Sequence, residues 1–255
     1  MSRIEVITSR TNPLVSQIRK LEKDRAYRRE TGLFLCDGVK LYEEALRWRA
    51  EVETVLFTPG RRPEEIPQDA RAVQVPEGLM SALSPAKTPQ GLLFLCRQPR
   101  TELPEKLIGS RYLVLDGLQD PGNVGTIWRT ADAFGADGLI LTRSCADPWH
   151  SKTVRATMGA AFRLPVWEAE PETLAKALNE AGIPLYGTCL REDTVDLRTY
   201  DGGSAAVVIG NEGNGISDEV LKLCCRTWKI PMEPKCESLN AAAAAAVVLW
   251  ELYRR

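Results

Sequence analysis

Three short segments of the chain combine glycines or a proline with polar side chains that could take part in catalysis or binding. Each follows an apolar run that is typical of a β-strand, and strands alternating with helical patterns predict a parallel sheet covered by helices. Ligands of open α/β sheets bind at the carboxyl ends of the strands, so we expect functional groups to lie there. The segments are Asn123–Gly135 (NVGTIWRTADAFG), Val208–Ser217 (VIGNEGNGIS) and Ile230–Ala243 (IPMEPKCESLNAAA).

The first segment leaves a turn, Asp120–Asn123, and enters a helix that we expect to start near Val124. The unpaired N–H groups at that helix N-terminus suit an anion such as phosphate. Asn123 is either a functional group or an ordinary N-cap. Arg129 lies six residues further, about a turn and two-thirds of helix away. It is either a binding group that faces the same cleft or half of a surface salt bridge.

The second segment holds a glycine-rich loop, Gly210–Gly215, directly after the apolar run AAVVI. Glycines permit positive φ and let a ligand approach the backbone closely. The spacing fits neither GxGxxG nor a Walker loop, which argues against nucleotide-phosphate binding. Glu212 could hold an arginine through a bidentate pair, and the alternative is that the loop is a plain turn.

The third segment ends a strand at Ile230-Pro231-Met232 and leads to the last helix, expected over Leu239–Tyr253. Ser238 is the expected N-cap of that helix. Ile230, Met232 and Leu239 could line an apolar slot in which backbone groups bind a ligand, because most pockets are apolar with a few fixed polar atoms.

The first hundred residues predict a separate, small α/β unit. Asn12-Pro13 is a helix start, since Asn caps and Pro is favoured at the first helical position. Strands are expected near LFLC, VETVLFT, ARAVQV and GLLFLC, with a helix from Val39 to about Arg49. The polar stretch 99–110 contains Pro99, Pro104 and Gly109 and predicts a connection. The expected division is a domain over 1–100, a linker over 101–110 and a second domain over 111–255.

Composition excludes several classes of protein. Hydrophobic residues make up 44% of the 255 residues and charged residues 26%, which fits a globular protein with a core. No apolar run approaches the roughly 20 residues that span a bilayer, and no signal peptide is evident, so we expect a cytoplasmic protein. The seven cysteines form no CxxC pair, and His150 is the single histidine. A zinc ribbon, a His-based metal site and a Ser-His-Asp triad are therefore not supported.

Positive charge is concentrated near the N-terminus although the net charge of the chain is −1. The first 30 residues carry eight basic and four acidic side chains. Phosphate contacts need such a local concentration and not a basic protein overall. On charge alone, a nucleic-acid contact and a solvated helix face remain equally open. The candidate binding residues on the first helix are Arg19, Lys20 and Lys23.

Taken together, the three segments resemble the three motifs of the SpoU/TrmH branch of the SPOUT RNA methyltransferases. The family's first motif pairs an Asn with an Arg six positions on, as Asn123 and Arg129 do here. Its second places a Glu in an Asn-Gly loop, here Glu212, and its third is Ser-Leu-Asn after a strand ending Ile-Pro, here Ser238–Asn240. The segments KTVRATMGAAF (152–162), FLCDG near Asp37 and TPQGLL near Gly91 extend the resemblance over nearly the whole chain.

The resemblance implies a C-terminal trefoil-knotted SPOUT domain with a parallel sheet, preceded by a small N-terminal α/β (L7Ae-like) domain that binds RNA. It implies S-adenosylmethionine as the cofactor, contacted by Gly210, Ile230, Met232 and Leu239, and a homodimer formed through the knotted domain. The substrate would be RNA, most readily ribosomal RNA, with no role for DNA, metal or membrane. The 2′-hydroxyl of RNA is what DNA lacks.

The implied reaction moves a methyl group from a sulfonium to a ribose 2′-hydroxyl. Arg129 stands where the family has its proposed base, but an arginine hardly ever loses its proton. We therefore expect Arg129 to bind phosphate and stabilise negative charge on the 2′-oxygen, with its neighbours holding it and the ribose in place. Those neighbours are Asn123, Glu212, Ser238 and Asn240.

Three alternatives remain open from the sequence. One is a cysteine mechanism through Cys236, although a free cysteine is more often inert than nucleophilic. Another is a non-catalytic RNA-binding or ribosome-assembly factor that uses the same cleft. The third is the same reaction on transfer RNA.

Overall fold

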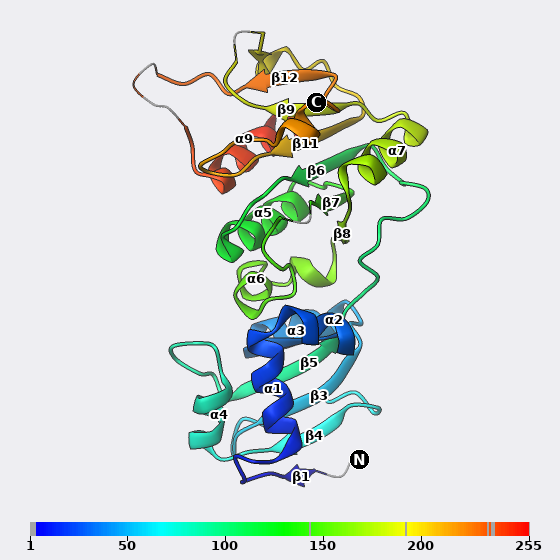
Figure 1. Ribbon diagram of the computed structural model, residues 1–255. Helices are drawn as coiled ribbons and strands as arrows, with labels where there is room; N and C mark the ends of the chain where they lie inside the picture. The colour runs from blue at the N-terminus through cyan, green and yellow to red at the C-terminus, as the bar shows by residue number, and fades with distance from the viewer. Residues whose placement is uncertain (1–3, 143, 192, 234, 236–237, 255) are drawn as a thin grey trace. The chain divides into compact units, whose positions relative to one another are not determined.

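The computed structural model describes residues 4–142, 144–191, 193–233, 235 and 238–254. The chain divides into two compact units, each with its own sheet (Figure 1). The N-terminal unit comprises Met1–Pro99 and Trp149–Phe162, and the C-terminal unit comprises Arg100–Pro148 and Arg163–Arg255. No helix among the described residues is long and apolar enough to cross a membrane.

The N-terminal unit is built on a mixed five-stranded sheet in the order β1-β4-β3-β5-β2. β1, β3 and β4 run parallel to one another, whereas β5 is antiparallel to both β2 and β3. A small α/β unit was expected here, and the mixed sheet confirms it. The strands are β1 (Glu5–Val6), β2 (Leu33–Asp37), β3 (Val52–Phe57), β4 (Arg71–Gln74) and β5 (Leu92–Arg97).

Helices complete this unit and follow the local signals in the sequence. Asn12 caps the first helix by accepting a hydrogen bond from the backbone N–H of Leu14, and Pro13 is its first residue, as expected. Leu14, Ile18 and Leu21 bury one stripe of that helix in a core with Leu35, Val73 and Leu93. The helices are α1 (Pro13–Lys23), α2 (Arg25–Thr31), α3 (Val39–Arg47), α4 (Glu77–Leu83) and α6 (Ser151–Ala156), with a 3-10 turn at Ala160–Phe162.

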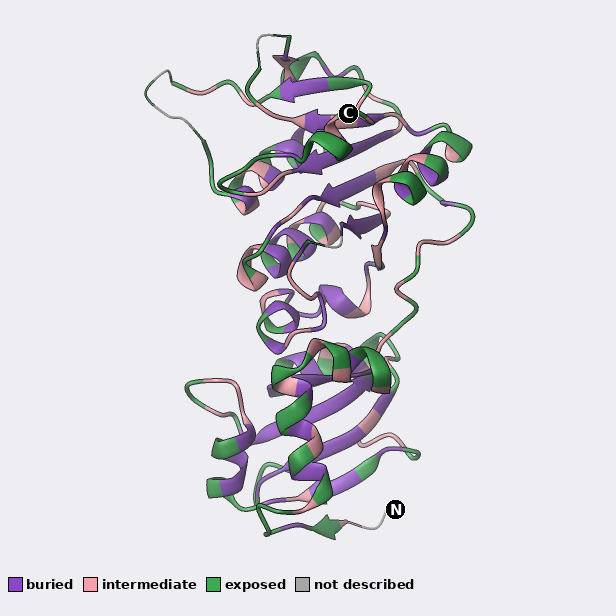
Figure 2. Ribbon diagram, in the orientation of Figure 1, coloured by how far each residue is buried: buried purple, intermediate pink, exposed green. Residues whose placement is uncertain are grey.

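The C-terminal unit has a seven-stranded sheet in the order β10-β12-β9-β11-β6-β7-β8. Every pairing in it is parallel, which confirms the parallel sheet. Its central strands β6, β7 and β11 are buried almost throughout (Figure 2), as expected of a sheet covered on both faces. The strands are β6 (Arg111–Leu115), β7 (Gly138–Leu141), β8 (Val166–Glu168), β9 (Leu185–Thr188), β10 (Val195–Asp196), β11 (Ala205–Ile209) and β12 (Arg226–Lys229).

Helices lie on both sides of this sheet. One core cluster joins Leu174 and Val220, from two of these helices, to Val114 and Val208 of the central strands. α5 and α9 pack against each other, and α9 also packs against β11 (Figure 1). The helices are α5 (Pro121–Ala133), α7 (Pro171–Ala181), α8 (Asp218–Leu221) and α9 (Ala241–Tyr253), with a 3-10 turn at Leu197–Thr199.

Two expected helix starts are wrong, and both errors concern the cap. α5 begins at Pro121 and not near Val124, because Asp120 accepts a hydrogen bond from the N–H of Asn123 (2.9 Å) and is the N-cap. α9 begins at Ala241, and its N-cap is Asn240 and not Ser238. As a result, Asn123 lies inside the first turn of α5, where its side chain is not needed for capping.

Candidate active site

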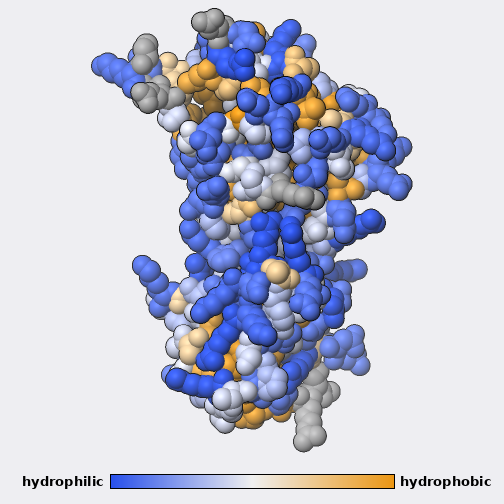
Figure 3. Space-filling model, viewed as in Figure 1, coloured by the Kyte–Doolittle hydropathy of each residue, from blue (hydrophilic) through white to orange (hydrophobic). Residues whose placement is uncertain are grey.

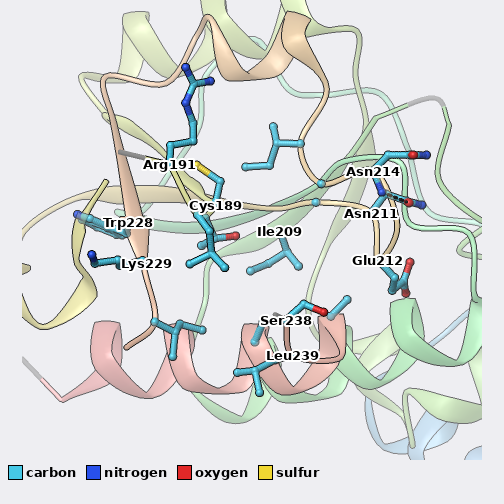
Figure 4. Close-up of a pocket in the computed structure, with 18 of the residues that line it drawn as sticks. Cys189, Arg191, Ile209, Asn211, Glu212, Asn214, Trp228, Lys229, Ser238 and Leu239 are labelled. Atoms are coloured by element: carbon cyan, nitrogen blue, oxygen red, sulfur yellow. Dashed lines mark hydrogen bonds between the residues drawn. The ribbon is translucent and has the colours of Figure 1, made fainter. Parts of the chain in front are cut away.

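The carboxyl ends of β9, β11 and β12 surround a cleft of about 480 Å³ in the C-terminal unit. Figure 4 shows Ile209 near its centre, with Asn211 and Glu212 toward one end and Trp228 and Lys229 toward the other. The start of α9 forms another side of the cleft. The lining segments are residues 188–191, 209–216, 228–230, 232, 238, 239, 241 and 244, together with Leu221.

The glycine-rich loop beside the cleft is held by hydrogen bonds to its own backbone. Asn211 and Gly215 exchange backbone hydrogen bonds of 2.8 and 2.9 Å. The side chain of Asn211 accepts from the N–H groups of Gly213 and Asn214 and donates to the carbonyl of Gly117 (2.8 Å). A Cβ atom at Gly210 would lie 2.4 Å from the carbonyl carbon of Gly215. The loop therefore closes only with glycine at 210.

Asp116 anchors this loop to the sheet and was not among the expected site residues. Its side chain is buried, with 4% of the residue exposed. One carboxylate oxygen accepts from the hydroxyl of Thr142 (2.9 Å) and the other from the backbone N–H of Ser217 (2.7 Å). Because Ser217 follows the glycine-rich loop, Asp116 fixes where that loop ends. The signal in the sequence was a lone acidic residue at the end of the apolar run YLVLD.

Three of the expected catalytic residues form one hydrogen-bonded chain. The side-chain amide of Asn240 donates to the side-chain oxygen of Asn123 (3.2 Å). Asn123 donates in turn to a carboxylate oxygen of Glu212 (2.5 Å). The oxygen of Asn240 accepts from the N–H groups of Ala242 and Ala243, so the start of α9 orients this chain. One residue from each of the three motifs is thereby brought together.

The other expected residues do not belong to this hydrogen-bonded chain. Gly210, Ile230, Met232 and Leu239 all line the cleft, as does Ser238. Arg129 is exposed on α5, and its guanidinium forms no ion pair or hydrogen bond with any residue that the structure describes. Glu212 binds Asn123, and among the residues that the structure describes it forms no bidentate pair with an arginine. Arg129 is thus available to a ligand, and the hydrogen-bonded chain of Asn240, Asn123 and Glu212 is formed without it.

Cys224, near the cleft, is poorly suited to act as a nucleophile. Burial raises the pKa of Cys224 to about 12, so its thiol stays protonated near neutral pH. Cys189 lines the cleft, and its thiol lies 3.9 Å from the hydroxyl of Thr194. Cys236, the residue of the alternative mechanism, lies outside the described residues.

Comparison with known proteins identifies the family. Residues 110–250 match the SpoU rRNA Methylase family, and residues 12–93 match an MRM3-like substrate binding domain. The first match covers more than half of the chain. The protein belongs to the SpoU rRNA methylase family. It is accordingly an S-adenosylmethionine-dependent rRNA 2′-O-ribose methyltransferase, which confirms the expected reaction and argues against a non-catalytic factor.

Individual relatives align over almost the full length. The 23S rRNA (guanosine(2553)-2′-O)-methyltransferase of Bacillus subtilis is 33% identical, over 96% of this chain and 98% of the relative. The 23S rRNA (uridine(2479)-2′-O)-methyltransferase of Streptomyces viridochromogenes is 32% identical, over 98% of this chain and 92% of the relative. The solved structure of an AdoMet-bound rRNA methyltransferase from Sinorhizobium meliloti is 32% identical and covers 98% of each chain, with a TM-score of 0.87.

The residues of the cleft fit this cofactor. A volume of about 480 Å³ lies within the usual range for small-molecule sites, about 300–1,000 Å³. The apolar side chains of Ile209, Ile230 and Leu239 suit a flat base, and the glycine-rich loop lines the cleft at Gly210, Gly213 and Gly215. Glu212 supplies negative charge at the rim, which is compatible with a sulfonium cation.

The expected RNA-binding residues lie on α1 of the N-terminal unit, which matches the substrate binding domain. Arg19, Lys20 and Lys23 are all exposed, away from the buried stripe. The ammonium group of Lys20 lies 5.3 Å from the centre of the Tyr27 ring, a cation–π contact that holds it on the surface.

We predict that Asp116→Ala weakens binding of S-adenosylhomocysteine roughly tenfold, since an unpaired buried donor costs about 1–3 kcal/mol. Asp116→Asn should lose less affinity, because the side-chain oxygen of the asparagine still accepts from Ser217 and its side-chain amide can donate to Thr142. Calorimetry measures the affinities, and thermal unfolding reports the accompanying loss of stability. Wild-type affinity in Asp116→Ala would show that the loop is positioned without this carboxylate.

Proposed function

We propose that the protein methylates a ribose 2′-hydroxyl of 23S rRNA. The relatives from Bacillus subtilis and Streptomyces viridochromogenes carry this substrate in their names and align with nearly all of this chain. The observation that carries the proposal is the hydrogen-bonded chain Asn240–Asn123–Glu212 at the rim of the apolar cleft. It places polar groups of fixed orientation where a ribose can meet the cofactor.

The chemistry needs a positioned hydroxyl more than a strong base. S-adenosylmethionine supplies an electrophilic methyl group on its sulfonium, and Gly210, Ile230, Met232 and Leu239 would hold it, largely through backbone and apolar contacts. The ribose hydroxyl is a weak nucleophile, so the protein must orient it and favour negative charge on its oxygen. Asn123, Glu212, Ser238 and Asn240 serve orientation in this scheme.

Arg129 supplies the electrostatic part of the mechanism. Its guanidinium is exposed and has no carboxylate partner in the described chain, so it is free to bind an RNA phosphate. A bound phosphate would bring the adjacent ribose to the rim of the cleft. The positive charge then stabilises the developing 2′-oxyanion, while the arginine keeps its proton. The hydroxyl proton passes to solvent or to the phosphate and not to Arg129.

The C-terminal unit is further proposed to be a trefoil knot. Support comes from Ile230, Met232, Ser238 and Leu239, which lie between β12 and α9 in the sequence and line the same cleft as the glycine-rich loop. α9 then packs against α5 and β11, and β11 is separated from β12 by β9 in the strand order. A knot would hold both lining segments around one ligand.

A homodimer formed through this unit is proposed as well. α9 buries Val248, Leu249 and Leu252 inside the unit but leaves Trp250 and Tyr253 each 55% exposed and Val247 41% exposed. An apolar surface on a helix is typical of an interface between subunits. The proposed division of labour assigns RNA binding to residues 1–100, a linker to 101–110 and methyl transfer to 111–255.

The substrate is tested by mapping 2′-O-methylated riboses in RNA from cells with and without this gene. Loss of one methylated position in 23S rRNA is expected, and the purified protein should restore it from labelled S-adenosylmethionine. Loss of a methyl group from transfer RNA, with ribosomal RNA unchanged, would replace the proposed substrate by the alternative.

Arg129→Ala should reduce methyl transfer on the order of a hundredfold to a thousandfold, the usual effect of removing one transition-state electrostatic group. Affinity for S-adenosylhomocysteine should stay near the wild-type value, because Arg129 does not line the cleft. Arg129→Lys should restore little, since a point charge does not reproduce a planar fork. Single-turnover transfer and calorimetry give the two readouts. A near-normal single-turnover rate in Arg129→Ala would assign the electrostatic role to another group.

The double charge reversal Lys20→Glu/Lys23→Glu should weaken RNA binding and flatten its dependence on salt. Each lost phosphate contact lowers the slope of log affinity against log salt by roughly one unit. Cofactor affinity should be unaffected, because both residues belong to the N-terminal unit. If affinity and slope match the wild type, these lysines are only part of a solvated helix face.

A further inference from the structure

Three segments of the N-terminal unit converge where β2 and β3 end and β5 begins. β2 and β3 flank β5, with Asp37 opposite Leu93 and Phe57 opposite Leu92. The segments that leave β2 and β3 therefore meet the segment that enters β5. They are residues 38–40, 58–62 and 84–91, the last being the loop between α4 and β5 (Figure 1).

Hydrogen bonds tie these loops to one another. The backbone N–H of Val39 donates to the side-chain oxygen of Gln90 (3.0 Å), and that of Thr58 donates to the carbonyl of Gly91 (3.0 Å). The hydroxyl of Ser84 donates to the carboxylate of Asp37 (2.5 Å). The three loops thus form one surface, which includes the FLCDG and TPQGLL segments of the chain.

Gly91 explains how closely the loops approach. Its φ of +80° is rarely adopted by residues with side chains. A Cβ atom there would lie 2.7 Å from the hydroxyl of Thr58 and 2.9 Å from Cγ of Arg61. The side chain of Arg61 consequently lies directly over the start of β5, close to the loop that carries Lys87.

Four exposed cations extend from these segments: Lys40 from the first turn of α3, Arg61 and Arg62 from the segment after β3, and Lys87 from the loop before β5. Within the described part of the chain, none of them forms an ion pair or a side-chain hydrogen bond. Glu64 and Glu65 follow Arg62 in the sequence, but neither pairs with these cations. Other arginines of the same unit are paired: Arg47 with Glu44 (3.1 Å), Arg71 with Glu5 (2.7 Å) and Arg97 with Glu53 (2.6 Å).

The carboxylate beneath this surface does not neutralise it. Burial raises the pKa of Asp37, and the hydrogen bond from Ser84 and the positive charge of Arg155 act in the opposite direction. The carboxylate of Asp37 is therefore already stabilised within the unit by the hydroxyl of Ser84 and the positive charge of Arg155. The four exposed cations have no carboxylate partner among the described residues.

We propose that Lys40, Arg61, Arg62 and Lys87 form a second phosphate-binding surface for the substrate RNA, here termed the loop-edge patch. All four lie inside the match to the substrate binding domain, and hydrophilic residues cover most of the visible face of this unit (Figure 3). Unpaired lysine and arginine side chains are the groups that bind phosphate backbones. The inference rests on the proposed RNA substrate and adds a contact surface separate from the lysines of α1.

The test compares two double variants that remove the same charge. Lys40→Ala/Lys87→Ala removes two cations of the loop-edge patch, whereas Arg47→Ala/Arg71→Ala removes two paired cations of the same unit. Binding of unmodified 23S rRNA, transcribed in vitro, is measured from low to moderate salt. The patch variant should bind more weakly, with a slope shallower by about 1.4–1.8 units, because each phosphate contact contributes about 0.7–0.9. The control should keep the wild-type slope.

Two further readouts separate the possible failures. Calorimetry with S-adenosylhomocysteine and thermal unfolding should be the same for both variants and the wild type, since exposed side chains alone are changed. A patch variant that keeps the wild-type slope, or a control that loses as much, overturns the loop-edge patch. If the wild type methylates transfer RNA and not 23S rRNA, the proposed substrate is wrong, and the same slope comparison on that transfer RNA decides the patch.

Discussion

The parallel pairing of β6 with β11 is the constraint on which the active site depends. Leu115 lies opposite Ile209, and the N–H of Asp116 continues the ladder to the carbonyl of Ile209 (2.9 Å). In this register the first two motifs leave the sheet side by side. A parallel register is weakly specified by turns, because its strands are joined by long crossovers. The carboxylate of Asp116 adds specificity by accepting hydrogen bonds from Thr142 and Ser217, so the end of β6 and the end of the glycine-rich loop are fixed together.

The polar chain Asn240–Asn123–Glu212 is a consequence of that register. Asn123 and Glu212 are 89 positions apart, and Asn123 and Asn240 are 117 apart. Helix capping decides how the side chains of Asn123 and Asn240 are oriented. Asp120 satisfies the N–H of Asn123 and thereby leaves the Asn123 side chain to bridge the other two motifs. Asn240 caps α9 with its oxygen and uses its remaining amide on Asn123. A substitution in either cap would therefore be felt at the rim of the cleft as well as in helix stability.

Much of this architecture follows from local sequence, and the exceptions have physical causes. Apolar runs such as AAVVI and YLVLD became buried central strands, and Asn12-Pro13 started a helix. The helix starts at Pro121 and Ala241 were mispredicted because Asp120 competes with Asn123, and Asn240 with Ser238, for the role of N-cap. Glu212 binds Asn123, and it pairs with no arginine in the described part of the chain. Asp116 was missed because a buried carboxylate is recognisable only once its partners are known.

Pairing with a carboxylate distinguishes the cations that stabilise this protein from the cations that are available to a substrate. Arg129 and the loop-edge patch belong to the second group. Arg71, Arg97 and Arg163 each bind a carboxylate and have their charge balanced within the fold. Arg129, Lys40 and Lys87 have no such partner in the described chain, although the chain as a whole is slightly acidic. Exposed pairs contribute little to stability, so pairing serves mainly to remove charge from the surface that a polyanion meets. A net charge of −1 is then compatible with RNA binding, because acidic residues neutralise arginines elsewhere and leave a few cations unopposed where phosphates bind.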